Sequence, residues 1–300
     1  MSRTYEFQQV DVFTDRVFGG NPLAVFTDGE GLSEREMQAI ALEMNLSETT
    51  FVLPADEPAH AARVRIFTPR AELPFAGHPT IGTAWVLTEN GQIPSGHSEV
   101  TLELGVGPIG VRFERHGSGP GFIWMNQGAP DFGEIVNDRQ GIADALGIEI
   151  DLLAEDLPVQ FVSTGLPFLF VPLVSAEAVD RASLSSAGLG SAGSNVNGAF
   201  IFHSEPGSNR AYSRMIATIG GTVWEDPATG SANGPLGAYM VRHGLTSGHE
   251  RVDIISEQGT RMGRQSFVHI RVAVEQGAPT AVQVGGSVVP VLSGTLQLPE

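Results

Sequence analysis

The sequence predicts an α+β protein made of two duplicated halves, and three observations support this fold class. Short apolar segments recur at an offset of 149 residues, so that Phe51-Val52-Leu53 matches Phe200-Ile201-Phe202. Strand-like and helix-like segments follow one another in the same order in both halves. Each half also contains a glycine-rich loop directly before an apolar helix. A repeat of this kind indicates one supersecondary unit that is used twice.

The predicted order in each half is strand, turn, strand, helix, two strands, glycine-rich loop, helix and further strands. Residues 20–26 resemble residues 165–171, and a helix-like run follows each segment. The glycine-rich loops are residues 75–82 and 226–234. The predicted helices cover residues 33–44, 79–89, 175–184 and 231–243, and the later strands cover residues 100–104, 110–114, 121–125, 252–256, 266–274 and 280–285.

The length of 300 residues corresponds to two domains at ~100–200 residues per domain. A stretch rich in Gly, Pro and Asn at residues 127–133 is a candidate linker, so we expect domains over residues 1–126 and 127–286. The C-terminal stretch 288–298 could close either half. Because ligands favour the junctions between domains, we expect both glycine-rich loops to face one cleft.

Acidic residues outnumber basic ones by 34 to 17, which gives a formal net charge of −17. Such a surface repels phosphate backbones and anionic lipid headgroups, so we expect neither nucleic acid nor membrane as a partner. No apolar run reaches the ~20 residues that span a bilayer. The first residues lack the apolar core of a signal peptide, so we expect a cytoplasmic protein. The absence of cysteine excludes disulfides, thiolate metal sites and cysteine bases.

Each glycine-rich loop leads into a predicted helix N-terminus, where unpaired backbone N–H groups and about half a positive charge favour anions. Glycine lets the backbone approach an anion closely. Two such loops could hold the carboxylates of a small acid without Arg or Lys. The alternative is a plain helix cap, since Asp226, Thr229 and Ser231 are common N-cap types. The two interpretations are compatible.

Glu48 lies in Asn45-Leu46-Ser47-Glu48-Thr49-Thr50, directly before the predicted strand at Phe51. It could be a solvated residue at a turn. At the offset of 149 residues its counterpart is Asn197, so a carboxylate occupies this position in one half only. One ionisable group on a duplicated frame could place an acid/base on one side of a substrate. Such a Glu needs a pKa raised toward neutrality, which burial in a dry cleft supplies.

His78 lies inside the first glycine-rich loop, and its counterparts near residues 230–232 include no base. An ordinary histidine pKa near 6.5 would suit proton transfer. A lone histidine is more often a structural residue than a catalyst, and both interpretations stay open for His78.

Other catalytic patterns do not fit the sequence. Residues 105–110 match the dinucleotide fingerprint G-x-G-x-x-G, but the strand-like Val111-Arg112-Phe113 follows where the fingerprint needs a helix. We therefore expect a hairpin turn there. No G-x-S-x-G or Walker sequence occurs, and the eight histidines lack the close spacing of metal ligands, so no metal site is expected.

Several short motifs occur in order between residues 9 and 264. They are Gln9-Val10-Asp11-Val12-Phe13, Gly20-Asn21-Pro22-Leu23-Ala24-Val25, Asn45-Leu46-Ser47-Glu48-Thr49-Thr50-Phe51-Val52, Arg65-Ile66-Phe67-Thr68-Pro69, Glu72-Leu73-Pro74-Phe75-Ala76-Gly77-His78-Pro79-Thr80, Glu225-Asp226-Pro227-Ala228-Thr229-Gly230-Ser231-Ala232 and Met262-Gly263-Arg264. Together they resemble the phenazine-biosynthesis isomerase (PhzF-like) family, which shares the diaminopimelate epimerase fold.

This resemblance implies two pseudo-symmetric domains, each a curved mixed sheet wrapped around a central helix, with the active site between them. The helices after the two glycine-rich loops would be the central helices. Residues 287–300 would return to the first domain. Members of the family are commonly homodimers, so a second copy of the chain is an expected partner.

Carried over by position, the resemblance places the general acid/base at Glu48 and the active-site histidine at His78. It places the family's aspartate at Asp226 and its serine at Ser231. We expect His78 and Asp226 to act with Glu48 in catalysis, as groups that shuttle protons or polarise the substrate. Backbone N–H groups of the two loops are expected to hold the substrate carboxylate and a developing enolate. The residues expected to bind substrate in this way are Gly77, Thr229, Gly230 and Ser231.

Related epimerases carry one cysteine in each loop, where this chain has Ala76 and, in the second half, Ala228 or a close neighbour. A racemisation with two thiols is therefore excluded. The chain departs from the family pattern at residues 219–224, which we expect to be longer or more irregular than usual. Trp224 of this segment is expected to line the pocket.

The sequence thus predicts a metal-free and cofactor-free isomerase. In it, Glu48 would shift a proton on a small carboxylate-bearing, possibly cyclic substrate. The best-known activity of the family moves a proton on a dihydro-hydroxyanthranilate ring. Two alternatives stay open: a lyase or hydrolase on the same fold, and a non-catalytic protein that binds small acids.

Overall fold

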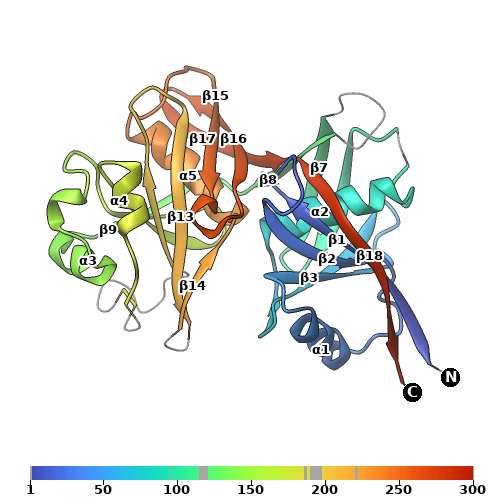
Figure 1. Cartoon of the computed structure of the whole chain (residues 1–300). Helices are drawn as coiled ribbons and strands as arrows, with labels where there is room; N and C mark the ends of the chain where they lie inside the picture. Colours follow the sequence, from blue (N-terminus) through green and yellow to red (C-terminus); the bar gives the residue numbers. More distant parts are fainter. Residues whose placement is uncertain are drawn as a thin grey trace. The chain divides into compact units, whose positions relative to one another are not determined.

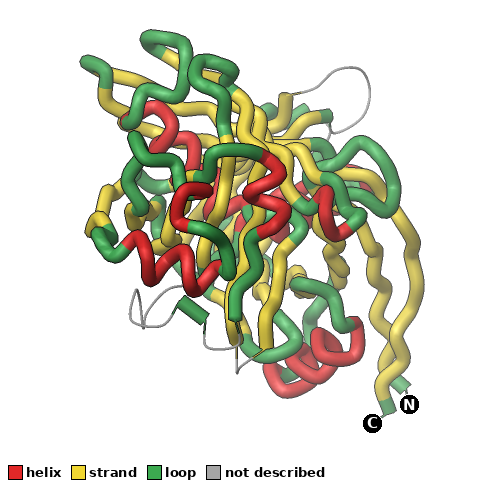
Figure 2. Tube along the Cα trace, turned by 60° about the vertical axis from the view of Figure 1, so that its left-hand side comes forward, coloured by secondary structure: helices red, strands yellow, loops and turns green. Residues whose placement is uncertain are grey.

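The computed structural model describes residues 2–94, 96–114, 121–185, 188–189, 198–219 and 222–299. The chain forms two compact units (Figure 1). Unit 1 consists of Met1–Asn126 and Gly285–Glu300, and unit 2 consists of Gln127–Val284. Strands make up most of the regular structure, and short helices lie between them (Figure 2).

Unit 1 contains the first part of the chain and its last strand. Its elements are β1 (Arg3–Val12), β2 (Asn21–Phe26), α1 (Glu34–Met44), β3 (Glu48–Leu53), β4 (Ala62–Phe67), β5 (Glu72–Leu73), α2 (Gly77–Glu89), β6 (Glu99–Leu104), β7 (Gly107–Glu114), β8 (Phe122–Gln127) and β18 (Val288–Leu298). β18 pairs antiparallel with β1, and antiparallel pairs also join β6 to β7 and β7 to β8.

Unit 2 contains the middle of the chain. Its elements are β9 (Asp131–Ile135), α3 (Arg139–Leu146), the 3-10 helix η1 (Ile150–Leu152), β10 (Gln160–Ser163), β11 (Pro167–Pro172), α4 (Ala176–Arg181), β12 (Ala199–His203), β13 (Arg210–Ile219), β14 (Thr222–Asp226), α5 (Gly230–Arg242), β15 (Arg251–Gln258), the 3-10 helix η3 (Thr260–Met262), β16 (Ser266–Glu275) and β17 (Ala278–Gly286). β9 pairs with β10, and β15 pairs with β16, both antiparallel.

The two units repeat one sequence of strand pairings. In unit 1, β1 and β2 are antiparallel, β2 and β3 are parallel, and β3 and β4 are antiparallel. β4 then pairs antiparallel with β5 and parallel with β6. In unit 2, β10 to β15 pair in the same order and with the same directions. The predicted α+β fold class with duplicated halves is confirmed.

One apolar helix is buried inside each unit. Every residue of α2 from Gly77 to Thr88 is buried, and in α5 Gly230 and the run from Ala232 to Met240 are buried. α2 packs against β1, β2, β3 and β18, and α5 packs against β10, β11, β15 and β16. A helix that is buried all round needs apolar neighbours on every side. Each sheet supplies them by curving around its helix, as predicted.

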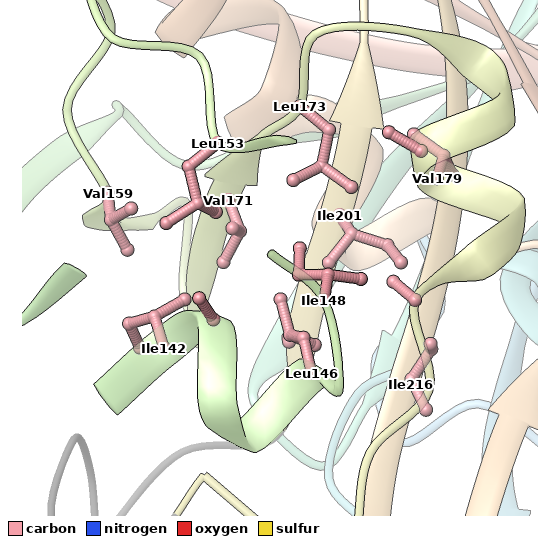
Figure 3. Close-up of a cluster of buried hydrophobic side chains, with 14 of the residues drawn as sticks. Ile142, Leu146, Ile148, Leu153, Val159, Val171, Leu173, Val179, Ile201 and Ile216 are labelled. Atoms are coloured by element: carbon pink, nitrogen blue, oxygen red, sulfur yellow. The ribbon is translucent and has the colours of Figure 1, made fainter. Parts of the chain in front are cut away.

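The smaller helices cover a second apolar core in each unit. In unit 1, α1 packs over three neighbouring aromatic rings, Phe26, Phe51 and Phe67. In unit 2, α3 and α4 lie on the sheet and bury side chains between themselves and the strands (Figure 3). The main members of this second cluster are Ile142, Leu146, Ile148, Leu153, Val171, Leu173, Val179, Ile201 and Ile216.

Parts of the structure differ from the sequence-based expectation. Residues 127–133 were expected to be a linker, but they include the end of β8 and the start of β9, since Phe132 pairs with Val162 of β10. α3 was not expected from the sequence. Its apolar pattern is short, and only Ile142, Ala143 and Leu146 of its eight residues are buried. The stretch 219–224 includes regular β14 pairing with β13, and its residues 220 and 221 lie outside the described residues. The hairpin expected at residues 105–110 is confirmed, since Leu104 pairs with Gly107.

Glycine allows both central helices to approach their sheets closely. A Cβ atom on Gly82 of α2 would lie 2.6 Å from Cδ2 of Leu23 and 2.8 Å from Cγ2 of Val12. A Cβ atom on Gly237 of α5 would lie 2.5 Å from Cγ2 of Ile270. A larger residue at either position would push the helix away from its strands.

Replacing Gly82 with alanine should therefore destabilise the fold. Overpacking of a tight contact costs about 1–3 kcal/mol, which exceeds the gain of up to about 1 kcal/mol in helix propensity. Urea unfolding of Gly82→Ala should show a lower free energy of unfolding than the wild type. Gly96→Ala is the control, because nothing lies within 4 Å of a Cβ atom there. Equal stability of the two variants would contradict the packing argument.

Candidate active site

Glu48 and His78 come from two neighbouring elements of unit 1. Glu48 is the first residue of β3, opposite Leu23 of the parallel strand β2, and His78 is the second residue of α2. A hydrogen bond between Oγ1 of Thr50 and Oγ1 of Thr83, 2.9 Å long, joins β3 to α2. Glu48 and Thr50 lie on the same face of β3 because side chains alternate along a strand. The Glu48 side chain therefore points to the helix side, where His78 lies.

The two side chains meet in a buried place. Nε2 of His78 lies 3.3 Å from Oε2 of Glu48, and the side chains are only 4% and 13% exposed, respectively. The possible role of Glu48 as a solvated turn residue does not agree with this burial.

Burial also sets the charge of His78. It lowers the pKa of His78 from 6.5 to about 3, while a hydrogen bond to the backbone of Pro22 opposes the shift. The imidazole is therefore neutral at neutral pH, with one donor and one acceptor nitrogen. Because the ring N–H donates to the carbonyl of Pro22, Nε2 presents its lone pair to Glu48. This nitrogen can accept a hydrogen bond from a protonated Glu48 carboxyl.

Asp226 lies in unit 2, at the end of β14 and just before α5. It is buried, and its Oδ2 accepts a hydrogen bond of 2.5 Å from the hydroxyl of Thr229. The N–H of Thr229 donates to Oε1 of Gln258, and Nε2 of Gln258 donates to the Thr229 hydroxyl. The N–H, the hydroxyl and the carbonyl of Thr229 are thus all engaged within the protein. This arrangement favours a supporting role for Thr229 rather than direct contact with a substrate.

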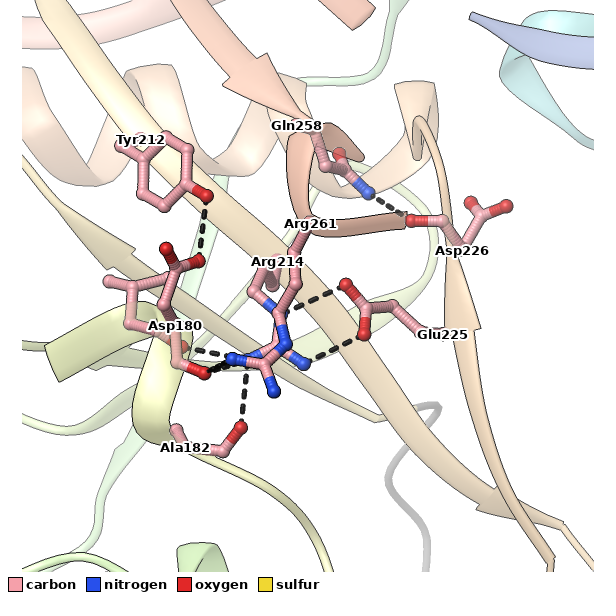
Figure 4. A network of polar contacts seen from close by, with 9 residues as sticks. Asp180, Ala182, Tyr212, Arg214, Glu225, Asp226, Gln258 and Arg261 are labelled. Atoms are coloured by element: carbon pink, nitrogen blue, oxygen red, sulfur yellow. Dashed lines mark hydrogen bonds and ion pairs between the residues drawn. The ribbon is translucent and has the colours of Figure 1, made fainter. Parts of the chain in front are cut away.

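A buried ion pair fixes the strand that carries Asp226 (Figure 4). Arg214 of β13 makes two hydrogen bonds to the carboxylate of Glu225, the residue before Asp226, at 2.9 and 2.7 Å. The Arg214 guanidinium also donates to the carbonyls of Val179 and Ala182 at the end of α4, at 2.8 and 2.7 Å. The hydrogen bonds of Arg214 therefore join β13, β14 and the end of α4 to one another next to Asp226.

The first turns of the central helices differ from those of the other helices. Ser33, Asp138 and Ser175 cap α1, α3 and α4 with side-chain hydrogen bonds to the backbone. Ala76 and Thr229, which precede α2 and α5, make no side-chain cap hydrogen bond. Thr229 thus occupies the N-cap position of α5, as expected for a cap residue, but its hydroxyl bonds to Asp226 and does not cap the helix.

Comparisons with known proteins identify the family of the chain. The family model of "phenazine biosynthesis-like protein" matches residues 10–294. The chain is 36% identical to trans-2,3-dihydro-3-hydroxyanthranilate isomerase of Pseudomonas chlororaphis, over 96% of this chain and 98% of that protein. It is also 36% identical to an uncharacterized isomerase of Mesorhizobium japonicum, over 98% and 99% of the two chains. The chain belongs to the phenazine biosynthesis-like (PhzF) family.

Solved structures show the same relationship. A phenazine biosynthesis protein of the PhzF family from Bacillus anthracis aligns with a TM-score of 0.85 at 27% identity, over 98% of this chain and 99% of that one. A predicted epimerase from Pseudomonas aeruginosa aligns with a TM-score of 0.80 at 36% identity, over 97% and 99%. A hydroxyproline epimerase from Agrobacterium vitis, 12% identical with a TM-score of 0.66, over 99% of this chain and 94% of that one, shares the fold. With its relatives named as isomerases, this PhzF-family chain is an isomerase.

The structure brings together the predicted site residues of each unit. Glu48 and His78 are in contact, and Gly77 begins α2 beside them. Asp226 contacts Thr229, and Gly230 and Ser231 are the first residues of α5. Asn197, the counterpart of Glu48, lies outside the described residues.

The sequence did not reveal the residues that hold Asp226 and its strand in place. Arg214, Glu225 and Gln258 are held by hydrogen bonds that join distant segments, and no local motif marks them. One signal was present: Arg214 is the repeat counterpart of Arg65. Arg65 of β4 makes the same two-bond contact with Glu72 of β5, at 2.7 and 2.6 Å.

The described part of the chain shows no group of three or more His, Asp or Glu side chains that could hold a metal ion. Among the same residues, no helix is long and apolar enough to cross a membrane.

The lowered pKa of His78 predicts a loss of stability in acid. The unfolded chain binds a proton at His78 near pH 6.5, whereas the folded chain does so only near pH 3. Below pH 6.5 the unfolded state binds more protons, so the free energy of unfolding falls by up to about 1.4 kcal/mol per pH unit from this residue. Urea unfolding between pH 7 and pH 4.5 should show a smaller slope for His78→Gln. His249→Gln, at an exposed position, should keep the wild-type slope.

Removing Arg214 should destabilise unit 2 strongly. Arg214→Ala leaves the Glu225 carboxylate, only 18% exposed, without its cation. Breaking a buried pair in this way costs about 3–5 kcal/mol. Arg63→Ala is the control, because its pair with Asp56 is 44% and 69% exposed and should cost about 1 kcal/mol or less. Similar losses in both variants, measured by thermal unfolding, would contradict the structural role of the Arg214 pair.

Proposed function

We propose that Glu48 removes a proton from a small carboxylate-bearing substrate and returns it to another carbon, without a cofactor. The supporting observation is the buried contact of 3.3 Å between Oε2 of Glu48 and Nε2 of His78. A carboxylate in a place of this kind is a suitable acid/base near neutral pH, because burial disfavours its charged form. The absence of cysteine leaves no thiol for the same step.

The proposed reaction moves one proton within the substrate and neither adds nor removes atoms. The Glu48 carboxylate takes a proton from a carbon next to a carbonyl or conjugated system, and the electron pair of the C–H bond moves into an enolate-like intermediate. The protonated Glu48 carboxyl can donate a hydrogen bond to the neutral His78 ring. The same proton is then delivered to another carbon as the double bond shifts. Reactant and product have the same mass.

The helix N-termini supply the substrate-binding groups of this proposal. Backbone N–H groups at Gly77, Gly230 and Ser231 would hold the carboxylate and the negative charge that develops on the intermediate. Asp226 would act on the same substrate as a hydrogen-bond acceptor, since the Thr229 hydroxyl donates to its Oδ2. Glu48 and Asp226 would then have different tasks because their surroundings differ.

The names of two relatives support a proposal for the substrate class. Proteins of Pseudomonas chlororaphis and Pseudomonas fluorescens, each 36% identical to this chain, are named trans-2,3-dihydro-3-hydroxyanthranilate isomerases. We therefore propose a cyclic carboxylic acid with an activated ring proton as the substrate. Trans-2,3-dihydro-3-hydroxyanthranilate is the first compound to test.

The two alternatives make different predictions. A lyase or hydrolase changes the mass of its substrate, whereas the proposed isomerase does not. A non-catalytic binding protein would not need Glu48 to be buried beside a histidine. The observed burial of both side chains therefore favours catalysis.

Glu48→Gln should abolish the proton shift, because an amide cannot exchange a proton as a carboxylate does. Loss of a positioned acid/base lowers the rate by about 100–10,000-fold. Reaction in heavy water, followed by mass spectrometry and NMR, should show no deuterium in trans-2,3-dihydro-3-hydroxyanthranilate or its product. Glu43→Gln is the control, because Glu43 lies exposed on α1. Unchanged turnover of Glu48→Gln would remove Glu48 from the mechanism.

A combination of variants tests whether Asp226 acts in the same reaction. Asp226→Asn should also lower kcat, and the double variant with Glu48→Gln should be hardly slower than Glu48→Gln alone, because groups that act as a unit are not additive. Wild-type kcat in Asp226→Asn would remove Asp226 from the mechanism.

A further inference from the structure

Gln258, the last residue of β15, makes four hydrogen bonds from one fully buried side-chain amide. Its Oε1 accepts from the backbone N–H of Thr229 at 3.1 Å and from Nδ2 of Asn233 at 2.9 Å. Its Nε2 donates to the backbone carbonyl of Asp226 at 2.8 Å (Figure 4) and to Oγ1 of Thr229 at 3.0 Å. One side chain therefore joins the end of β14 to the first turn of α5.

The sheet brings Gln258 to this place. β13 pairs with β15 at Ser213, opposite Gln258, and with β14 at Met215, opposite Asp226. The two strands thus end next to each other along β13. Gly259 follows with a φ of 74°, and a Cβ atom there would lie 2.5 Å from the carbonyl oxygen of Pro227. Only glycine allows β15 to end so close to the segment after Asp226.

The backbone partners fix the direction of these hydrogen bonds. The N–H of Thr229 can only donate, so Oε1 of Gln258 faces it, and the carbonyl of Asp226 can only accept, so Nε2 faces that group. Nε2 also donates to the Thr229 hydroxyl oxygen. The hydroxyl proton is then directed to Oδ2 of Asp226, at 2.5 Å.

We propose that Gln258 is a positioning residue for Asp226: acting through the Thr229 hydroxyl, it keeps Oδ2 of Asp226 as an acceptor and holds the carboxylate in one orientation. This inference rests on the proposed role of Asp226 in the reaction. Hydrogen bonds to the charged form of a carboxylate favour that form. Asp226 would therefore stay ionised while Glu48 gains and loses its proton.

Two substitutions remove this chain of hydrogen bonds at different points. Thr229→Val removes the hydroxyl with little change of shape, and Gln258→Met removes the amide with a side chain of similar length. Thr229→Ser keeps the hydroxyl and should rescue the wild-type behaviour. Gln160→Met is the matched control, because Gln160 is a buried amide of unit 2 that bonds to Gly133 and His243 instead.

The first readout needs no substrate. NMR titration of ¹³C-labelled aspartate carboxyl groups would follow Asp226, identified by the signal that Asp226→Asn lacks. The midpoint of this titration should move up by about one pH unit or more in Thr229→Val and in Gln258→Met. It should stay at the wild-type value in Thr229→Ser and Gln160→Met. An unchanged midpoint in folded Thr229→Val, or an equal shift in Gln160→Met, would overturn the proposal.

The second readout is turnover of trans-2,3-dihydro-3-hydroxyanthranilate. We expect kcat to fall about 10–100-fold in Thr229→Val and in Gln258→Met, with a smaller change in KM, and the double variant to be no slower. If Asp226→Asn is inactive while Thr229→Val and Gln258→Met keep wild-type kcat, the positioning role is wrong and the proposed function stands. If Asp226→Asn keeps wild-type turnover, the proposed role of Asp226 is wrong, and the titration alone decides the role of Gln258. Should Gln258→Met fail to fold, Thr229→Val decides the proposal.

Discussion

The burial of one helix over most of its length in each unit is the constraint on which the rest of the structure depends. From Gly77 to Thr88 all residues of α2 are buried, so its few polar side chains need partners within the protein, as Thr80 and Thr88 find in the carbonyls of Ala76 and Ala84. Its unpaired backbone N–H groups are then concentrated at its N-terminus. The proposed functional groups lie at or next to the starts of α2 and α5, within the glycine-rich stretches or beside them. Gly82 and Gly237 are part of the same constraint, because they let each helix lie against its strands.

Two carboxylates on strands of the two units, Glu48 of β3 and Asp226 of β14, have different surroundings. Glu48 faces a nitrogen of the neutral His78 ring, which can only accept a hydrogen bond from it. Asp226 instead receives the proton of the Thr229 hydroxyl. The first environment suits a carboxyl that carries a proton during part of the cycle, and the second suits one that remains a carboxylate. Pairs of acidic groups with such different surroundings are typical of acid/base catalysis.

The sequence predicted the features that leave a local or repeated pattern. The repeat of Phe51-Val52-Leu53 at residues 200–202 revealed the duplication, and the apolar runs after the glycine-rich loops revealed both central helices. Glu48 stood out because its counterpart is not acidic. Gln258 and Arg214 could not be found in this way, since their partners lie up to 35 residues away in sequence and become neighbours only through strand pairing. The sequence also gave no sign that Thr229 bonds to Asp226 rather than capping α5.

The two units share a structural support but carry different side chains at the proposed site. An arginine of the fourth common strand holds a glutamate of the fifth in both, Arg65 with Glu72 and Arg214 with Glu225. These pairs fix the strand before each glycine-rich loop, but only the second pair is nearly buried. The support is thus common to both units, whereas the groups it supports differ: a histidine beside a glutamate in one, a hydroxyl beside an aspartate in the other. The proposed proton shift would use this difference, because one carboxylate would exchange a proton while the other kept its charge.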